Sequence, residues 1–347
     1  QLHRRQRQMC IRDSYLTEAF QVNDSNPVLL DKFLDVAIEF DVEAISDGTE
    51  ILICGILQHI EQAGVHSGDS ACSIPPYNID KKTEDKIRKE VIKVIENMEI
   101  IGLVNVQIAY VNNTVYLLEV NPRASRTIPF VSKALGMPLA KIAARVMAGI
   151  SLKEQKISEV PKLEFFNVKE AVMPFEKFQN VDPILGPEMR STGEVMGIGK
   201  TFEEAFEKAE IAAGVSIPDS GSAFISVRNT DKQFLKDIAE DLTTAGFTLV
   251  GTKGTVRTLK ELGYPARQIN KVLEGRPHII DLMKNKEISL VINTTEGRES
   301  IKDSASIRRT ALEEKICCTT TIQGAVAICK VIRNQLDWSV QKLQDIH

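Results

Sequence analysis

The stretch L-V-N-V-Q-I-A-Y-V-N-N-T-V-Y-L-L-E-V-N-P-R, residues 103–123, decides the fold of the first half of the chain. Two apolar runs flank the polar triplet Asn112-Asn113-Thr114, an order that is typical of a β-hairpin. A three-residue loop over this triplet pairs Gln107 with Glu119 on one face, whereas a two-residue loop would pair Gln107 with Leu118. The register therefore decides whether the two polar side chains meet.

The segments around the hairpin predict an antiparallel sheet covered by helices. Apolar runs and period-two alternation predict strands, and apolar side chains at helical spacing predict helices. The strands predicted before the hairpin are 28–30, 36–44 and 51–57. The predicted helices are 83–98, before the hairpin, and 130–135 and 139–147, after it.

The C-terminal part of the chain follows a different pattern. Residues 150–214 are rich in prolines and irregular, and we interpret them as a region connecting a domain at 15–149 to another at 215–347. The strands predicted in the last domain are 223–227, 247–250, 288–293 and 316–320. The helices that alternate with them are 232–244, 255–262, 304–314 and 322–332. This alternation predicts a parallel-sheet α/β domain with helices on both faces.

The composition narrows the class of protein. Of 347 residues, 43% are hydrophobic and 26% charged, which is typical of a globular protein of about two domains and excludes a disordered chain. A net charge of −4 does not indicate nucleic-acid binding, and the longest apolar run, Ile51–Leu57, is far shorter than a membrane span of ~20 residues. Six cysteines without a C-x-x-C pair indicate reduced thiols and a cytoplasmic location.

Residues 1–14, QLHRRQRQMCIRDS, contain four arginines and lack the periodicity of a helix or a strand. The stretch resembles a translated sequencing adapter joined to a truncated reading frame, so we treat it as non-native. A basic targeting arm is the alternative. The residues that follow are then expected to be the C-terminal part of a larger protein.

Oxygen ligands gather at the second strand of the hairpin. Gln107, Glu119 and Asn121 together offer the hard oxygen atoms that suit Mg²⁺ shared with ATP phosphates. Just beyond that strand, Arg123 and Arg126 could bind an anionic, phosphorylated intermediate, because guanidinium groups pair with carboxylates and phosphates. The alternative is a solvated hairpin face without a ligand.

A second group of polar residues predicts an anion site in the C-terminal domain. Thr252-Lys253-Gly254-Thr255 lies between a predicted strand and a predicted helix, where free backbone N–H groups favour an anion. Further polar side chains in or at the ends of other elements are Lys232, Lys271, Asn293, Thr294, Thr295 and Arg298. Together they suit a nucleotide monophosphate, and ordinary caps and turns are the alternative.

The string Gly197-Ile-Gly199-Lys200-Thr201 resembles the end of a P-loop. The first glycine of that motif would fall at position 194, which is a glutamate. The segment is also not clearly a strand followed by a phosphate-binding loop, so no Walker A site is predicted.

Several strings resemble known ligase sequences. Glu119-Val-Asn-Pro-Arg123, after a hairpin that carries a metal-ligand glutamine, resembles the ATP-grasp ligases. The strings similar to the large subunit of carbamoyl-phosphate synthetases are E-Q-A-G-V-H-S-G-D-S at 61–70, F-V-S-K-A at 130–134, M-A-G at 147–149 and L-G-P-E-M-R-S-T-G-E-V-M-G at 185–197. The resemblance runs from about Pro27 to the C-terminus. It implies a partial ATP-grasp domain, an antiparallel sheet with helices, followed by a parallel-sheet α/β domain like methylglyoxal synthase.

By this resemblance, the first domain binds ATP with Mg²⁺ or Mn²⁺, and with K⁺ as a further cation. The residues implied for the nucleotide are Lys32, Leu34, Glu39, Gly64, Val65, His66, Ser67, Gln107 and Glu119. The residues implied for the divalent ions are Gln107, Glu119 and Asn121, and those for carbamate and its phosphorylated product are Arg123 and Arg126. Asp41 and Glu43 are expected on the solvated face of their strand. The covering lobe of an ATP-grasp site is not found, so half of an ATP site is expected.

The same resemblance gives the C-terminal domain a regulatory role. Asn293–Gly297 stands where catalytic methylglyoxal synthases carry a glycine-rich, aspartate-containing loop, which favours a regulatory site over a lyase. By the resemblance, UMP or IMP would bind at the polar group around 252–255. Ornithine is implied as a further effector, with four residues between the domains: Glu61, Asp69, Glu170 and Thr320. Acidic groups suit this cationic ligand. A tyrosine expected two residues before Thr320 is Cys318.

The family resemblance also implies an ATP-dependent ligase. The intact enzyme makes carbamoyl phosphate from bicarbonate, glutamine-derived ammonia and two ATP, for pyrimidine and arginine synthesis, and this part would phosphorylate carbamate. The implied partners are the N-terminal part of the large subunit and the glutaminase small subunit, and the chain alone is expected to be inactive. Three alternatives stay open: an effector-binding module without catalysis, another ATP-grasp ligase, and a lone methylglyoxal synthase.

Overall fold

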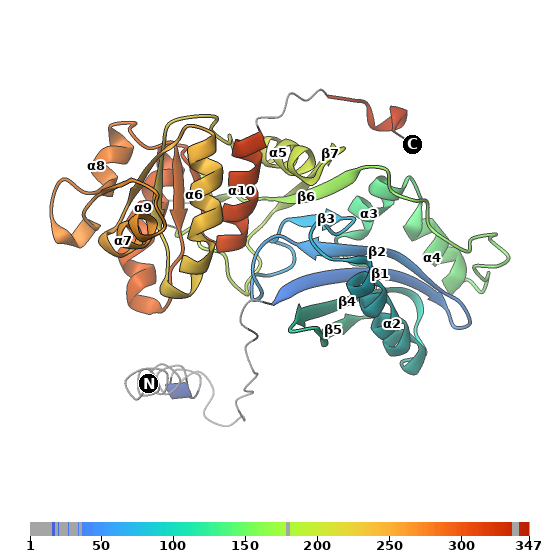
Figure 1. Cartoon of the computed structure of the whole chain (residues 1–347). Coiled ribbons are helices and arrows are strands. Elements are labelled where there is room, and N and C mark those ends of the chain that lie inside the picture. The colour runs from blue at the N-terminus through green and yellow to red at the C-terminus, as the bar shows by residue number, and fades with distance from the viewer. Residues whose placement is uncertain are drawn as a thin grey trace. The chain divides into compact units, whose positions relative to one another are not determined.

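The computed structural model describes residues 16–17, 20, 27, 34, 37–177, 181–334 and 340–346 (Figure 1). Three sequence predictions lie outside the described residues: the non-native segment 1–14, the strand at 28–30 and the nucleotide contact of Lys32. The chain divides into two compact units, 1–35 and 36–347, and both sheets belong to the second.

Among the described residues, seven antiparallel strands form the first sheet, in the order β5-β4-β1-β2-β3-β6-β7 (Figure 1). Their bounds are β1 Ile38–Asp47, β2 Ile51–His59, β3 Cys72–Ile74, β4 Ile101–Val111, β5 Thr114–Asn121, β6 Phe166–Val172 and β7 Gly193–Gly199. The antiparallel sheet predicted around the hairpin is therefore confirmed. β1 lies inside the sheet, between β4 and β2, so both of its faces can be covered.

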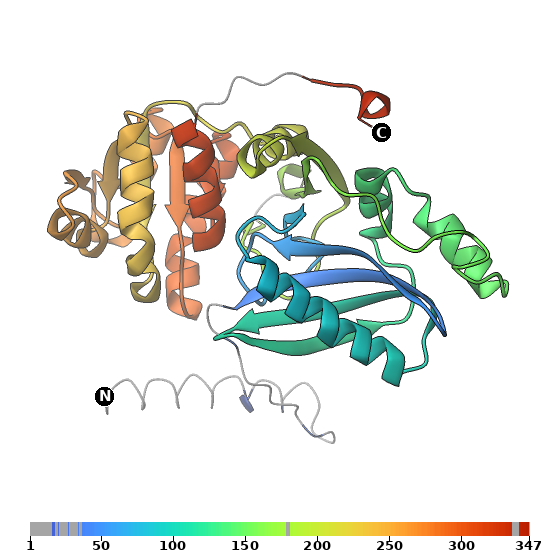
Figure 2. The same cartoon turned by 45° about the vertical axis from the view of Figure 1, so that its right-hand side comes forward.

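Helices cover the two faces of this sheet (Figure 2). On one face lies α2 (Lys81–Asn97), which begins at the N-cap Asp80 and buries a stripe of apolar side chains against β1, β2 and β4. On the other lie α3 (Ile128–Leu135) and α4 (Leu139–Met147), whose apolar sides pack on β1, β2 and β3. The three predicted helices are confirmed.

The β4–β5 hairpin combines a two-residue loop with the pairing of Gln107 and Glu119. Val111 pairs with Thr114, so the turn has two residues, and Asn112 and Asn113 both adopt positive φ angles of 49° and 60°. Asparagine tolerates this conformation better than other non-glycine residues, which is why the tight turn forms here. Of the two loop lengths considered from the sequence, the two-residue loop is therefore the one that forms. A β-bulge nevertheless skips Leu118, and this extra residue restores the pairing of Gln107 with Glu119.

Residues 150–214, which we interpreted as a connecting region, extend the first sheet. They contain β6, β7 and α5 (Phe202–Ala213), with α5 packed against both strands. The P-loop-like string has a packing role: a Cβ on Gly197 would lie 2.0 Å from the carbonyl oxygen of Ala205, so only glycine lets α5 approach β7 this closely. Thr201 is the N-cap of α5 and accepts a hydrogen bond from the backbone N–H of Glu204.

The second sheet has five described strands, all parallel, in the order β10-β9-β8-β11-β12. Their bounds are β8 Ser222–Ser226, β9 Thr248–Gly251, β10 Ala266–Gln268, β11 Leu290–Asn293 and β12 Cys317–Thr319. The helices are α6 Leu235–Thr244, α7 Lys253–Glu261, α8 Ile279–Lys284, α9 Arg298–Glu313 and α10 Ile322–Asn334. α6 and α10 pack on one face, and α8 and α9 on the other (Figure 2). The predicted parallel α/β domain is confirmed, with β10 and α8 as additions.

The two sheets share a hydrophobic core. One cluster of buried side chains joins Ile60, Ala71 and Val168 of the first sheet region to α5, α6, α10 and the second sheet. Tyr77 stacks on Phe202, with ring centroids 3.9 Å apart. In the described part of the chain, no helix has the length and apolar content needed to cross a membrane.

Candidate functional site

Three separate segments meet around the loop between β2 and β3, which spans residues 60–71. The backbone N–H of Gly64 donates to Oε1 of Glu39 on β1 (3.2 Å), and Nε2 of Gln107 on β4 donates to Oγ of Ser67 (2.9 Å). The buried ammonium group of Lys169 on β6 donates a hydrogen bond to the carbonyl of Ser67 (3.2 Å). The structure therefore brings together Glu39, the loop and Gln107, which the resemblance implied for ATP.

The remaining nucleotide candidates have simpler surroundings. Val65 is buried, and the ring of His66 accepts a hydrogen bond from the backbone of Gly68 (3.0 Å) through Nδ1. This bond shapes the loop, so His66 has a structural role in addition to any ligand contact. Leu34 is half-buried, and no hydrogen bond or ring contact of it is recorded in the described residues.

The candidate metal ligands lie on one face of the hairpin. Gln107 pairs with Glu119, and Asn121 lies two residues further along β5, on the same side. The amide nitrogen of Gln107 is used by Ser67, which leaves its oxygen for a cation. Glu119 is exposed, and Oδ1 of Asn121 accepts from Arg123 (3.4 Å). This set of oxygen atoms fits a hard divalent cation.

Arg123 and Arg126 lie on the turn that follows β5, here called the arginine turn (residues 121–127). Both side chains are exposed, and Arg126 contacts the sulfur of Met189. The backbone N–H of Arg123 donates to the carbonyl of Asn121 (2.8 Å), which folds the turn back on the strand end. Two guanidinium groups beside a carboxylate and two amides can bind a phosphorylated anion together with its metal ion.

The expectation that Asp41 and Glu43 face solvent is wrong. Their exposed fractions are 1% and 0%. β1 is an internal strand, and this face of it is covered by the arginine turn, α3 and β6. Asn105 on β4 donates to both carboxylates, at 3.3 Å to Asp41 and 2.8 Å to Glu43. The alternation of acidic residues along the strand is also typical of a solvated face, so the local pattern carries no signal for this burial.

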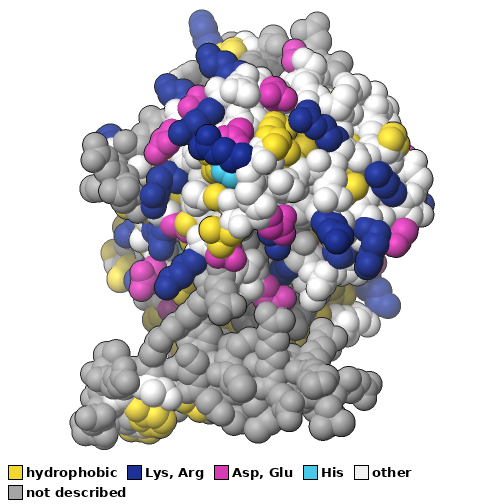
Figure 3. Space-filling view, turned by 90° about the vertical axis from the view of Figure 1, so that its left-hand side faces the viewer, with side chains coloured by type: hydrophobic (Ala, Val, Ile, Leu, Met, Phe, Trp, Pro, Cys, Tyr) yellow, Lys and Arg dark blue, Asp and Glu magenta, His cyan; other side chains and the backbone are white. Residues whose placement is uncertain are grey.

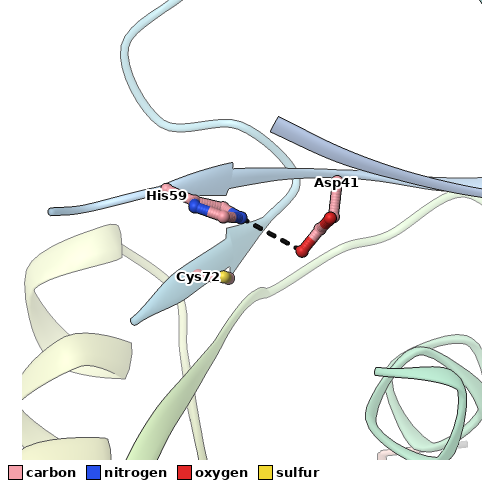
Figure 4. Close-up of side chains that lie close together, drawn as sticks. All are labelled: Asp41, His59 and Cys72. Atoms are coloured by element: carbon pink, nitrogen blue, oxygen red, sulfur yellow. Dashed lines mark hydrogen bonds and ion pairs between the residues drawn. The ribbon is translucent and has the colours of Figure 1, made fainter. Parts of the chain in front are cut away.

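Asp41, His59 and Cys72 form a buried cluster (Figure 4), and Glu39 lies beside it. Nε2 of His59 lies 3.1 Å from Asp41 Oδ2, and its Nδ1 lies 3.6 Å from Glu39 Oε2. Burial alone would lower the pKa of His59, but Cys72 and Asp41 raise it well above its ordinary value. A protonated imidazole does not ligate a metal ion, so this cluster favours an internal ion pair that supports Glu39. Sequence analysis did not single out His59.

The candidate effector residues lie where β8, β9 and β11 end. Backbone N–H groups of Val227 and Arg228, after β8, donate to Oγ1 of Thr255 (3.5 Å) and of Thr294 (3.1 Å). A Cβ built on Gly254 would lie 3.7 Å from Nζ of Lys232, so this ammonium lies over the start of α7. Carboxyl ends of adjacent parallel strands and a helix N-terminus form the usual ligand-binding edge of an α/β sheet.

Asn293 is the most informative residue of this group. It is 1% exposed, its Oδ1 accepts from Arg308 (3.2 Å), and its buried Nδ2 has no partner in the described part of the chain. A buried amide donor without a partner fits a ligand acceptor at this edge of the sheet.

The other candidates of this set are less constrained. The backbone N–H of Lys271 donates to Oε2 of Glu274 (3.0 Å), and the side chain of Lys271 is exposed. Thr252 is buried at the N-cap of α7, where Lys253 is exposed, and Thr295 is half-buried after β11. The side chain of Arg298 lies outside the described residues. On the face shown in Figure 3, Lys and Arg side chains lie among Asp and Glu side chains.

Arg228 links this pocket to the loop of the first sheet. Its guanidinium donates to Oδ2 of Asp231 (2.8 Å) and to Oε1 of Gln62 (3.0 Å). The same Asp231 oxygen accepts from Oγ1 of Thr294 (2.7 Å). A continuous path of hydrogen bonds therefore joins Thr294 to the loop 60–71 between β2 and β3.

Of the four residues implied for ornithine, two lie close together in the structure, Glu61 and Glu170. Burial raises the pKa of Glu61 and of Glu170, and the nearby carboxylate of Glu210 on α5, absent from the sequence prediction, raises that of Glu170 further. Oε2 of Glu170 is buried without a partner in the described residues. Both oxygens of Asp69 instead accept backbone N–H groups of Arg190 and Ser191, each at 2.8 Å. No hydrogen bond or ion pair of Thr320 to these acids occurs within the described ranges.

Comparison with known proteins identifies both halves of the chain. Residues 6–155 match the family described as "Carbamoyl-phosphate synthase L chain, ATP binding domain", and residues 235–320 match the "MGS-like domain". The first match begins inside the segment 1–14. Among solved structures, the biotin carboxylase domain of a thermophilic 2-oxoglutarate carboxylase bound to bicarbonate aligns over 56% of this chain and 50% of that chain, at 14% identity and a TM-score of 0.44. That likeness is too low to support an argument.

The curated relatives are carbamoyl phosphate synthase large chains. The chain is 55% identical to that of Pseudomonas aeruginosa over 333 residues, which are 96% of this chain and 31% of the relative. It is 52% identical to those of Halomonas eurihalina and Vibrio vulnificus, over the same shares. The chain thus spans about a third of the length of the relatives it matches. It belongs to the family of carbamoyl phosphate synthase large chains and corresponds to their C-terminal part.

Proposed function

We propose that this chain supplies the carbamate-phosphorylating site of a carbamoyl phosphate synthase large chain. One observation carries the proposal: the bulged hairpin pairs Gln107 with Glu119 while Gln107 also bonds to Ser67 of the nucleotide loop. Two candidate metal ligands and the nucleotide loop are thereby joined. The whole enzyme would make carbamoyl phosphate from bicarbonate, glutamine-derived ammonia and two ATP.

Gln107, Glu119 and Asn121 would hold Mg²⁺ or Mn²⁺, which supplies charge neutralisation at the phosphates of ATP. Glu39 would accept hydrogen bonds from the ribose, and its position is set by Gly64 and His59. Arg123 and Arg126 would bind and orient carbamate. A carbamate oxygen attacks the γ-phosphorus, the bond from that phosphorus to the β–γ bridging oxygen breaks, and ADP leaves. The guanidinium groups offset the charge of the transferred group, and no side chain is phosphorylated.

This arrangement is half of an ATP site, so activity would need the N-terminal part of the large chain and a glutaminase small subunit as partners. The reaction would take place in the cytoplasm. K⁺ would be a further cation of the complete enzyme.

The parallel-sheet domain would bind UMP or IMP at the edge formed by β8, β9 and β11. The phosphate would lie at Thr252–Thr255 with Lys232, Lys271 and Arg298 as counter-charges, and Asn293 to Thr295 would contact the rest of the nucleotide. The unpartnered amide nitrogen of Asn293 supports this assignment. Ornithine would bind at Glu61 and Glu170, with Asp69 and Thr320 at the margin.

A chimera tests the catalytic assignment. Residues 15–347 replace the corresponding part of the Pseudomonas aeruginosa large chain, and carbamoyl phosphate formation is measured with the small subunit. We expect a working enzyme whose rate falls at least about 100-fold on Glu119→Ala, because a metal ligand is lost. A folded chimera that tolerates Glu119→Ala would contradict the assignment.

A thermal melt of this chain with UMP and IMP tests the effector pocket. A ligand at a hundredfold excess over its Kd stabilises the native state by about 2.7 kcal/mol. We expect this gain to disappear in Lys232→Ala and to persist in Lys236→Ala, an exposed lysine of α6. No gain with either nucleotide, or full gain in Lys232→Ala, would contradict the effector assignment.

A further inference from the structure

Glu43 holds the arginine turn to the sheet although it lies more than eighty residues away in sequence. Its Oε1 accepts hydrogen bonds from Oγ of Ser125 and Oγ1 of Thr127, at sequence separations of 82 and 84. Asn105 on β4 donates to the same oxygen (2.8 Å). Glu43 has an exposed fraction of 0%, so these bonds are shielded from water.

The turn has few other anchors. Its own hydrogen bonds are local, such as the backbone N–H of Thr127 to Oγ of Ser125 (3.2 Å) and the N–H of Arg123 to the carbonyl of Asn121. The hydroxyl groups of Ser125 and Thr127 bond the turn to the sheet, and both donate to Glu43. Arg126, between them in sequence, is exposed and contacts the sulfur of Met189. Its charge acts on Glu194, but no ion pair of Arg126 within 4.0 Å occurs in the described residues. The placement of both guanidinium groups therefore depends on the backbone that carries them.

The second carboxylate oxygen of Glu43, Oε2, has different surroundings from Oε1. Oε2 is buried and has no partner in the described residues. A carboxylate with one oxygen desolvated and unpaired is unfavourable, and burial raises the pKa of Glu43 to about 7. Glu43 therefore acts as a hydrogen-bond acceptor at Oε1, and burial favours its neutral form. Glutamine has the same shape, is also neutral and keeps an acceptor oxygen.

We propose that Glu43 is a positioning residue for the carbamate site: it fixes the arginine turn through Ser125 and Thr127, and through the turn it places Arg123 and Arg126. The inference rests on the proposed function of these two arginines. It adds a residue that touches neither substrate nor metal. Glu43 lies on the same strand, β1, as Glu39, the residue proposed for the ribose, four positions further along the chain.

Two measurements on this chain test the proposal. Hydrogen exchange reports how firmly the turn is held without any ligand, and titration with inorganic phosphate reports anion binding. In Glu43→Ala we expect exchange across 121–127 at least tenfold faster and phosphate binding at least tenfold weaker. In Glu43→Gln, which keeps an acceptor oxygen at Oε1, both should stay within about twofold of the parent chain. Asp41→Asn, on the same buried strand face but without a bond to the turn, is the matched control and should leave the turn unchanged.

The pair Ser125→Ala and Thr127→Val removes the donors while Glu43 remains, so it tests the same link if Glu43→Ala does not fold. It should loosen the turn as Glu43→Ala does. Unchanged exchange in this pair, or a Glu43→Gln variant as loose as Glu43→Ala, would overturn the positioning role. Phosphate binding that does not depend on Arg126, measured with Arg126→Ala, would instead overturn the proposed function of the arginines, and the exchange data would still decide the role of Glu43.

Discussion

Replacing Glu43 with glutamine should remove a pH dependence from the stability of the chain. Burial raises the pKa of Glu43 from 4.5 to about 7, and the negative charge of Asp41 adds to this effect. The hydrogen bonds from Ser125, Thr127 and Asn105 act in the opposite direction and are weaker. The folded chain therefore keeps the proton of Glu43 at a pH where the unfolded chain has lost it.

The size and the sign follow from linkage. A carboxyl group with a raised folded-state pKa contributes stability that is fully present below pH 4.5 and is lost as pH rises to about 7. The difference, 7 minus 4.5, is about 2.5 pKa units at about 1.4 kcal/mol each, or about 3.5 kcal/mol as an upper value over the whole titration. Glutamine does not titrate. The stability of Glu43→Gln relative to the parent chain should thus rise by up to about 3 kcal/mol between pH 5 and pH 8.

Urea denaturation at pH 5, 6, 7 and 8, followed by circular dichroism, measures this difference. The other buried acids with raised pKa values, Glu61, Glu170 and Glu210, are present in both proteins and cancel in the comparison. A stability difference that stays constant within about 0.5 kcal/mol over this range would refute the reasoning, because Glu43 would then titrate alike in both states.

Three further substitutions test parts of the fold by chemical denaturation. Gly197→Ala should destabilise the chain by about 3 kcal/mol or more, because its Cβ would enter the backbone of α5. In Gly193→Ala, on the same strand, the new Cβ meets nothing within 4 Å, so this control should be nearly neutral. Equal effects of the two substitutions would contradict the packing argument. Asn113→Val should cost about 1–2 kcal/mol because a β-branched residue resists the φ of 60°, and an unchanged stability would mean that the turn is not as described. Arg308→Met should cost about 3–5 kcal/mol since the fully buried guanidinium pairs with Asp182, and a loss below about 1 kcal/mol would show that this pair is dispensable.

The elements with clear periodicity could be predicted from the sequence. The strand alternation at 36–44, the helix stripe at 83–98 and the βα order after Ser222 each reflect local spacing, and the structure confirms them. The short strand β10 and the helix α8 were missed because three and six residues are too few to show a period. β6 and β7 were missed because prolines on either side of them made 150–214 resemble a linker.

The candidate site was predictable only where a motif identified it. Periodicity placed Gln107 and Glu119 on the hairpin, but their pairing depends on a bulge at Leu118 that no local pattern predicts. Asp41 and Glu43 resemble a solvated strand face by alternation alone. Glu43 is bonded to the arginine turn, about eighty residues later in the chain, and Asp41 to Asn105 on β4, more than sixty residues later. Such long-range covering is invisible to a local pattern.

Formation of ATP from ADP and carbamoyl phosphate tests the central claim most directly, because this reverse transfer takes place at the ATP site to which the chain contributes and needs neither bicarbonate nor glutamine. In the chimera with the Pseudomonas aeruginosa N-terminal part, the account predicts ATP formation that depends on Mg²⁺ and falls at least about 100-fold in Glu119→Ala and in Arg126→Ala. Lys236→Ala serves as the unaffected control. A folded chimera that forms no ATP, or one that keeps its rate without Glu119, would contradict the account.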